Sequence, residues 1–168
     1  ILRCLVGSEM CIRDRIKVAK KLKKIVVPSE SSGKDVVKDF SLKDASIEVV
    51  HNGIDLGFFY PSDVPYEDYK ILSIASSDVP MKGLDFMIKA FPEIKKNYPK
   101  AKLSVLGKIR EEGHTERLIN SLDLKDDINF VSGLSHSELR EQYCSSHVVV
   151  IPSLYEGFGF AAAEAMAC

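Results

Sequence analysis

From residue 70 onward, the sequence alternates short, mainly apolar runs with longer segments whose apolar residues recur at helical spacing. The runs cover residues 71–75, 103–106, 128–131 and 148–151, and runs of this length are typical of buried parallel strands. The segments between them carry apolar residues on one helical face, such as Leu84, Met87, Ile88, Phe91 and Ile94, and then Leu118, Ile119 and Leu122. This alternation predicts a parallel sheet with right-handed crossovers, which is a Rossmann-like α/β half.

The residues before this alternation predict a separate, shorter α/β piece. Residues 16–24 are rich in lysine and end a helix that leads into a strand at 25–27. A second strand is predicted at 47–50, and the helix between them is expected to be capped by Ser32 with Asp35. Residues 61–69 contain two prolines and several acidic residues, which indicates a linker.

Two glutamates after the last apolar run form the most informative pattern for function. Glu156 falls in a glycine-bearing turn between the strand and an Ala-rich helix. Open α/β sheets bind ligands at this carboxyl edge, where helix N–H groups attract anions. Glu164 lies two turns further along and is flanked on both sides by apolar residues. A carboxylate in so apolar a helix favours a binding role over a solvated helix face.

Composition excludes several classes of protein. The chain has 168 residues, of which 45% are hydrophobic and 28% charged, as in ordinary soluble globular proteins. A net charge of −1 gives no argument for a nucleic-acid partner, and no apolar run approaches the roughly 20 residues of a membrane-spanning helix. The scattered Cys4, Cys11, Cys144 and Cys168 lack the spacing of a zinc site or disulfide framework. Reduced thiols in a cytoplasmic protein fit best.

Six short motifs, in register along the chain, resemble the retaining glycosyltransferases of the GT-B fold, the large family four. They are residues 25–31 (IVVPSES), 49–55 (VVHNGID), Lys82-Gly83, 130–133 (FVSG), 151–153 (IPS) and the Glu-x7-Glu pair formed by Glu156 and Glu164. The resemblance covers nearly everything after Ile16. It implies that residues 16–60 end an N-terminal acceptor domain, that 61–69 are the linker, and that 70–168 form a truncated C-terminal donor domain.

This resemblance also implies an activity. The full enzyme is expected to be a hexosyltransferase that moves a sugar from a nucleotide diphosphate sugar to a saccharide, lipid or small-molecule acceptor. The anomeric configuration would be retained, and no metal or other cofactor would be needed. A fragment without most of its acceptor domain is expected to be inactive. Two alternatives stay open: a noncatalytic nucleotide-binding Rossmann module, although a Gly-x-Gly-x-x-Gly fingerprint is absent, and a GT-B phosphorylase or sugar synthase.

By the same resemblance, the site residues divide between the parts of the donor. Lys82 would contact the donor phosphates, and Glu164 would bind the ribose hydroxyls. Glu156 would be the catalytic residue beside the donor sugar, either stabilising an oxocarbenium-like transition state or orienting the sugar. The glycine-bearing turn would offer backbone N–H groups to the donor through Gly157, Phe158, Gly159 and Phe160.

One position departs from the family pattern. Relatives usually carry an arginine six residues before the lysine, where this chain has Ser76. Lys108 follows a predicted strand and Gly107, so it is placed to reach the same edge and replace the arginine. A loss of affinity for the diphosphate is the other interpretation, and the sequence leaves both open.

Both ends suggest a gene fragment. Residues 4–15 resemble a translated sequencing adapter, so residues 1–15 are expected to be a non-native leader rather than a natural one. Cys168 ends the chain inside a predicted helix without a glycine or asparagine cap. The expected location is cytoplasmic. The lysines of 16–24 leave open a peripheral association with the inner face of the membrane, although a solvated helix face is favoured.

Overall fold

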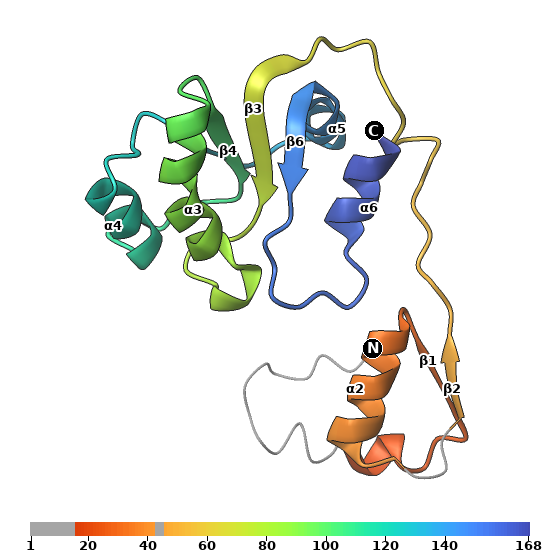
Figure 1. Cartoon of the computed structure of the whole chain (residues 1–168). Coiled ribbons are helices and arrows are strands. Elements are labelled where there is room, and N and C mark those ends of the chain that lie inside the picture. Colours follow the sequence, from red (N-terminus) through yellow and green to blue (C-terminus); the bar gives the residue numbers. More distant parts are fainter. Residues whose placement is uncertain (1–15, 43–45) are drawn as a thin grey trace. The chain divides into compact units, whose positions relative to one another are not determined.

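The computed structural model describes residues 16–42 and 46–168, and the chain divides into two compact units, Ile1–Gly53 and Ile54–Cys168 (Figure 1). The division falls between Gly53 and Ile54, ahead of the domain end at residue 60 that the resemblance implies. The predicted leader, residues 1–15, lies outside the described residues.

Among the described residues of the first unit, α2 (Glu30–Phe40) lies between two strands that pair in parallel, β1 (Lys24–Val27) and β2 (Ser46–Val49). Residues 16–19, in the segment predicted to end a helix, are also helical. A Cβ at the buried Gly33 would lie 3.1 Å from Ile47 Cγ2, so glycine lets α2 approach β2 closely. At the end of this unit, the His51 ring Nδ1 lies 3.0 Å from the Pro28 carbonyl oxygen. This hydrogen bond holds the chain after β2 against the chain after β1.

The predicted capping pair in this unit is wrong. The N-cap of α2 is Ser29 rather than Ser32, and its side chain accepts a hydrogen bond of 3.1 Å from the backbone N–H of Ser32. Ser29 has the extended backbone that a cap requires, with φ −155° and ψ 160°. The helix therefore starts almost directly after β1.

The second unit is built on four parallel strands, which confirms the predicted sheet. Their spatial order is β5-β4-β3-β6, with the bounds β3 (Glu67–Ile74), β4 (Lys102–Leu106), β5 (Ile128–Val131) and β6 (Ser146–Val150). In the register, Ile71 pairs with both Leu103 and Val148. The carboxyl ends of the central strands therefore meet at one edge of the sheet.

Helices cover both faces of this sheet: η1 (Pro80–Lys82), α3 (Leu84–Asn97), α4 (His114–Ser121), α5 (His136–Ser145) and α6 (Phe160–Ala167). The helices α3 and α4 pack on one face, whereas α5 and α6 contact the sheet from the other side (Figure 1). The predicted capping box of α5 is confirmed. Ser135 Oγ accepts from the Glu138 N–H at 3.3 Å, and the Glu138 carboxylate accepts from the Ser135 N–H at 2.7 Å.

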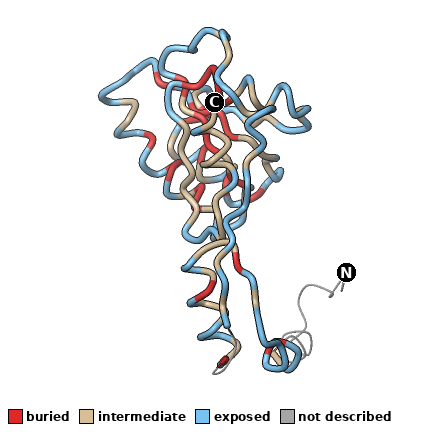
Figure 2. The backbone as a smooth tube through the Cα atoms, turned by 90° about the vertical axis from the view of Figure 1, so that its right-hand side faces the viewer, coloured by how far each residue is buried: buried red, intermediate tan, exposed pale blue. Residues whose placement is uncertain are grey.

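The main core lies between the sheet and the helices α3 and α4. Phe91 and Ile88 of α3 are fully buried against Leu103 and Val105 of β4. Figure 2 shows that the buried residues gather in the second unit. This core fixes the position of α3, and with it the turn that precedes the helix.

The start of the second unit is attached to α5. The carbonyl of Asp55 accepts hydrogen bonds from the N–H groups of Phe58 (3.1 Å) and Phe59 (2.8 Å). The Phe59 ring packs edge-on against Tyr143 of α5, and the Arg140 guanidinium lies 4.3 Å from the centre of the Tyr60 ring. Residues 55–60 therefore belong structurally to the second unit.

Across residues 16–42 and 46–168, no helix has both the length and the apolar character needed to span a membrane.

Candidate functional site

The strand order of the second unit places a switch point at the carboxyl ends of β3 and β6, and we call the region outside these strand ends the crevice. From β3 the chain moves through α3 to β4 on one side, whereas β6 lies on the other side of β3 and leads into α6. The loops after the neighbouring strands β3 and β6 therefore depart to opposite faces of the sheet. Ligands of open α/β sheets bind at such a switch point, outside the carboxyl ends of the strands.

The turn after β3 is pressed against the loop after β6. Gly83 ends η1 with a left-handed φ of +66°, and a Cβ at this position would lie 1.9 Å from the Pro152 carbonyl oxygen. Only glycine permits this approach of two backbones. Two positions away in each loop, the Leu154 N–H donates to the Met81 carbonyl at 2.9 Å. The two loops are thus held together on either side of Lys82.

This packing brings Lys82 and Glu156 together, although they are far apart in the sequence. Lys82 Nζ lies 2.9 Å from Glu156 Oε1, and both side chains are about half-buried. The hydrogen bond from Lys82 holds the pKa of Glu156 below its usual range. Partly exposed ion pairs contribute only about 0–1 kcal/mol to stability, so this pair matters more for the charge it places in the crevice than for folding.

Replacing Lys82 by methionine is expected to raise the pKa of Glu156, because the ammonium that stabilises the carboxylate is lost. In the unchanged chain, the lowered pKa contributes stability above the unfolded-state pKa, and this contribution disappears as the pH falls through the folded-state value. In the Lys82→Met variant, stability should no longer fall with the titration of Glu156 at acidic pH. Carbon-detected NMR titration of the Glu156 carboxyl group measures the change.

The matched control for this titration is Lys125→Met, which removes an exposed lysine from another loop. It should leave the Glu156 midpoint unchanged. An equal midpoint in Lys82→Met and the unchanged chain would contradict the ion pair.

The glycine-bearing turn lies between the two glutamates. Gly159 is the N-cap of α6 with a left-handed φ of +86°, and its carbonyl accepts hydrogen bonds of 3.1 Å from the N–H groups of Ala162 and Ala163. The rings of Phe158 and Phe160 meet edge-on at 5.1 Å. The first N–H groups of a helix have no intrahelical carbonyl and attract anions, so the start of α6 can bind negative charge at this edge.

Glu164 has a different environment from Glu156. It lies on α6, and its Oε2 accepts a hydrogen bond of 2.9 Å from the phenol of Tyr143 on α5. Tyr143 is only 4% exposed. The two glutamates of the motif therefore have separate partners, a lysine from the β3 turn and a tyrosine from α5.

Lys108 reaches the same edge through the loop after β4. The Ser77 hydroxyl donates to the Lys108 carbonyl at 2.7 Å and accepts from the Arg110 N–H at 3.2 Å. The loops after β3 and β4 are therefore tied together next to the Lys82 turn. Within the described part of the chain, the exposed Lys108 ammonium has no ion-pair partner.

A second tie runs from the β3 loop to α4. Asp78 has a left-handed φ of 56°, and its Oδ1 accepts a hydrogen bond of 2.9 Å from the Thr115 N–H. This backbone hydrogen bond is the main cause that lowers the pKa of Asp78. The loop that carries Ser76, where relatives have an arginine, is thus fastened to α4.

Sequence reasoning missed Tyr143, Ser77 and Asp78. Each makes its contact with a residue at least 21 positions away, and no local pattern indicates which distant residue a side chain meets. The predicted residues Lys82, Glu156 and the turn at 157–160 do lie together at the switch point, with Lys108 on an adjoining loop.

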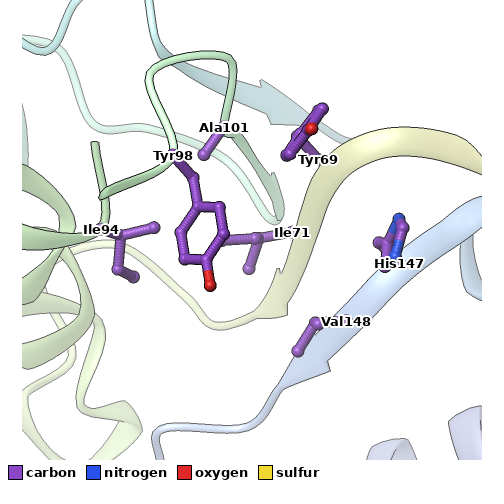
Figure 3. Close-up of a pocket in the computed structure, with 7 residues that line it drawn as sticks. All are labelled: Tyr69, Ile71, Ile94, Tyr98, Ala101, His147 and Val148. Atoms are coloured by element: carbon purple, nitrogen blue, oxygen red, sulfur yellow. The ribbon is translucent and has the colours of Figure 1, made fainter. Parts of the chain in front are cut away.

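A separate cavity of about 380 Å³ lies at the opposite end of the strands (Figure 3). Its lining is apolar and aromatic, and the Tyr98 ring lies between Ile94 and Ile71. Since this end carries the amino termini of the strands, it is distinct from the crevice. Among the described residues, no group of three or more His, Cys, Asp or Glu is placed to hold a metal ion.

Comparison with known proteins matches residues 61–168 to the family described as "Glycosyl transferases group 1". The chain is 35% identical over 151 residues to the MMP alpha-(1->4)-mannosyltransferase of Mycolicibacterium hassiacum. This match covers 90% of the chain and 36% of the relative. The chain thus spans about a third of the length of that curated relative.

Two solved structures share the fold. The sucrose-phosphate synthase from Thermosynechococcus elongatus superposes with a TM-score of 0.78 at 25% identity, over 97% of this chain and 43% of that one. The Anabaena protein Alr3699/HepE, solved in complex with UDP-glucose, gives a TM-score of 0.76 at 17% identity, over 96% of this chain and 47% of that one.

Proposed function

The chain belongs to the glycosyl transferases group 1, and from this premise we propose that the whole protein transfers a hexose from a nucleoside diphosphate sugar to an acceptor hydroxyl, with retention of the anomeric configuration. The second unit would bind the donor. The acceptor would be a saccharide, a lipid or a small molecule. No metal would be needed, because the site supplies its own positive charge.

The observation that carries the proposal is the Lys82–Glu156 pair. In a nucleoside diphosphate sugar, a single oxygen joins the anomeric carbon to the terminal phosphorus. A phosphate-binding group and a group beside the anomeric carbon must therefore be neighbours. Lys82 Nζ and Glu156 Oε1 are 2.9 Å apart, at the switch point where an α/β sheet binds its ligand. This contact supports a site in which the phosphate and the sugar of the donor would be bound by neighbouring side chains.

The order of residues after β6 matches the order of groups in such a donor. Glu156 would meet the sugar, the turn from Gly157 to Phe160 would meet the diphosphate, and Glu164 would meet the ribose. An ionised carboxylate only accepts hydrogen bonds, which suits the hydroxyl donors of a ribose. The separate partners of Glu156 and Glu164 support two binding roles rather than one acid/base pair.

Charge in the crevice suits the leaving group. When the bond between the anomeric carbon and the phosphate oxygen breaks, negative charge builds on the nucleoside diphosphate. Lys82 and the N–H groups at the start of α6 would stabilise this charge. Lys108 would add a second cation in place of the arginine that relatives carry at the position of Ser76. Ser77 supports this role, because it ties the Lys108 backbone to the β3 loop.

The relatives favour the same reaction class. The 35% identical protein is named a mannosyltransferase, and a structural neighbour was solved with UDP-glucose. Both names describe hexose chemistry. We therefore assign the donor to the nucleoside diphosphate hexoses and leave the base and the hexose to experiment.

The test compares two variants of the motif by isothermal titration calorimetry with UDP, GDP and ADP. Replacing Glu164 by alanine removes a charged partner of the ribose, which is worth about 1.5–3 kcal/mol. The affinity for the preferred nucleotide should fall about 10- to 100-fold. Replacing Glu156 by alanine should leave that affinity within about twofold, because free nucleoside diphosphate lacks the sugar.

Glu141→Ala is the matched control, since Glu141 is exposed on α5 away from the motif. Equal affinities in the two motif variants would refute the division of roles. Titration with inorganic phosphate separates the sugar phosphorylases: tight phosphate binding without nucleotide binding would refute the proposed donor class.

A further inference from the structure

Tyr143 is a buried polar residue whose hydroxyl group needs a hydrogen-bond acceptor. Its side chain is 4% exposed, and its hydroxyl donates to Glu164 Oε2 at 2.9 Å. Buried hydroxyl groups need a hydrogen-bond partner, and Glu164 provides it from the neighbouring helix. Among the described residues, no donor is hydrogen-bonded to the other carboxylate oxygen, Oε1.

The tyrosine ring is held in place from its other side. The Phe59 ring lies edge-on to it, with 6.2 Å between the ring centres. Burial and the bond to Glu164 raise the pKa of Tyr143 well above its usual range, so the phenol keeps its proton at every physiological pH. The direction of the hydrogen bond is therefore fixed, with Tyr143 always the donor.

We infer that Tyr143 is a positioning residue that holds Oε2 of Glu164 and leaves Oε1 to accept a ribose hydroxyl of the bound nucleotide. This inference rests on the role proposed for Glu164. A free glutamate on a helix samples several rotamers, and one that is already fixed loses less freedom when a ligand binds. The tyrosine would thus contribute to affinity without touching the nucleotide.

The position also predicts selectivity for ribose over deoxyribose. The hydroxyl assigned to Oε1 is the 2′-hydroxyl, the ribose group that acidic residues accept from in related nucleotide-binding sheets, and a 2′-deoxynucleotide lacks it. Loss of the phenol hydroxyl should weaken binding of the ribonucleotide and leave binding of its 2′-deoxy analogue unchanged. A purely structural role of Tyr143 would weaken both nucleotides alike.

The experiment measures affinities of the full chain for the preferred member of UDP, GDP and ADP and for the corresponding 2′-deoxynucleoside diphosphate. Tyr143→Phe keeps the ring and removes the hydroxyl. It should lower ribonucleotide affinity about three- to tenfold and leave deoxynucleotide affinity within about twofold. In the Glu164→Ala background, Tyr143→Phe should have no further effect. Tyr98→Phe, which removes an exposed phenol, is the matched control.

The outcomes separate the role of Tyr143 from the role of Glu164. Equal losses for both nucleotides in Tyr143→Phe would overturn the inference and leave the donor assignment intact. An unchanged chain that binds no nucleoside diphosphate, or does not prefer the ribonucleotide, would overturn the role of Glu164 together with the inference. Circular dichroism verifies the fold of each variant. If Tyr143→Phe does not fold, the hydroxyl-proton NMR signal of Tyr143 in the unchanged chain decides: it should shift with the ribonucleotide, and an equal shift with both analogues would contradict the inference.

Discussion

Replacing Gly83 by alanine is expected to cost about 2–5 kcal/mol of folding free energy and to abolish measurable nucleotide binding. The backbone at this position is left-handed, which costs about 1–2 kcal/mol for a residue with a Cβ. The added carbon would also overlap the Pro152 carbonyl oxygen at 1.9 Å, and forced overpacking costs about 1–3 kcal/mol. Relief of this clash must separate the turn that carries Lys82 from the loop that carries Glu156.

Urea denaturation measures the stability of this variant, and calorimetry with nucleoside diphosphates measures binding. Gly133→Ala is the matched control. Gly133 also has a positive φ of 75°, but a Cβ there would meet nothing within 4 Å. The Gly133→Ala variant should therefore lose only the folding free energy that the left-handed backbone costs, and it should keep its affinity for nucleotides. A Gly83→Ala variant as stable as Gly133→Ala would show that the two loops are not packed as described.

Replacing Phe91 by alanine should destabilise the second unit by about 3–5 kcal/mol, the usual loss when a buried phenylalanine becomes a cavity. Phe91 is fully buried in α3, where it packs with the core residues of β4. Thermal unfolding should show a lower melting temperature. Because α3 directly follows the Lys82 turn, nucleotide binding should also be lost at a lower urea concentration.

Phe86→Ala provides the comparison within the same helix. Phe86 is 59% exposed, so the same truncation should change stability by only about 0.5 kcal/mol. Similar losses for Phe86→Ala and Phe91→Ala would contradict the assigned core face of α3.

The parallel sheet could be predicted because each strand in the core is a short, mainly apolar run, but the extent of β3 could not. This strand begins at Glu67, inside the segment predicted as a linker. Lys70 looks like a surface residue, yet it is 7% exposed. Its ammonium donates to Glu67 Oε1 at 2.6 Å and to Ser145 Oγ at 2.9 Å. A buried lysine with partners is invisible to hydrophobic periodicity.

The site was predictable only in part for a similar reason. The turn at Lys82 and the two glutamates follow strand ends, and parallel strands bring such ends to one edge. The strand order is different: nothing in the apolar pattern of β6 indicates that it pairs with β3 rather than with β5. The ion pair of Glu156 and the hydrogen bond of Glu164 both depend on that order. The N-cap of α2 was predicted wrongly because Ser29, Ser31 and Ser32 all offer a hydroxyl. Which of them caps the helix depends on where β1 ends.

The attachment of residues 55–60 to α5 restricts where the chain can bend between its two units. The His51 ring is bonded to Pro28 in the first unit, and the carbonyl of Asp55 anchors the first turn of the second. Residues 52–54 are therefore the backbone between the last of these anchors in the first unit and the first anchor in the second. The Phe59 ring packs on Tyr143, which donates to Glu164, so the start of the second unit is one ring contact and one hydrogen bond away from Glu164. A substitution in residues 55–60 would therefore be felt at the tyrosine that we propose to orient the ribose-binding carboxylate.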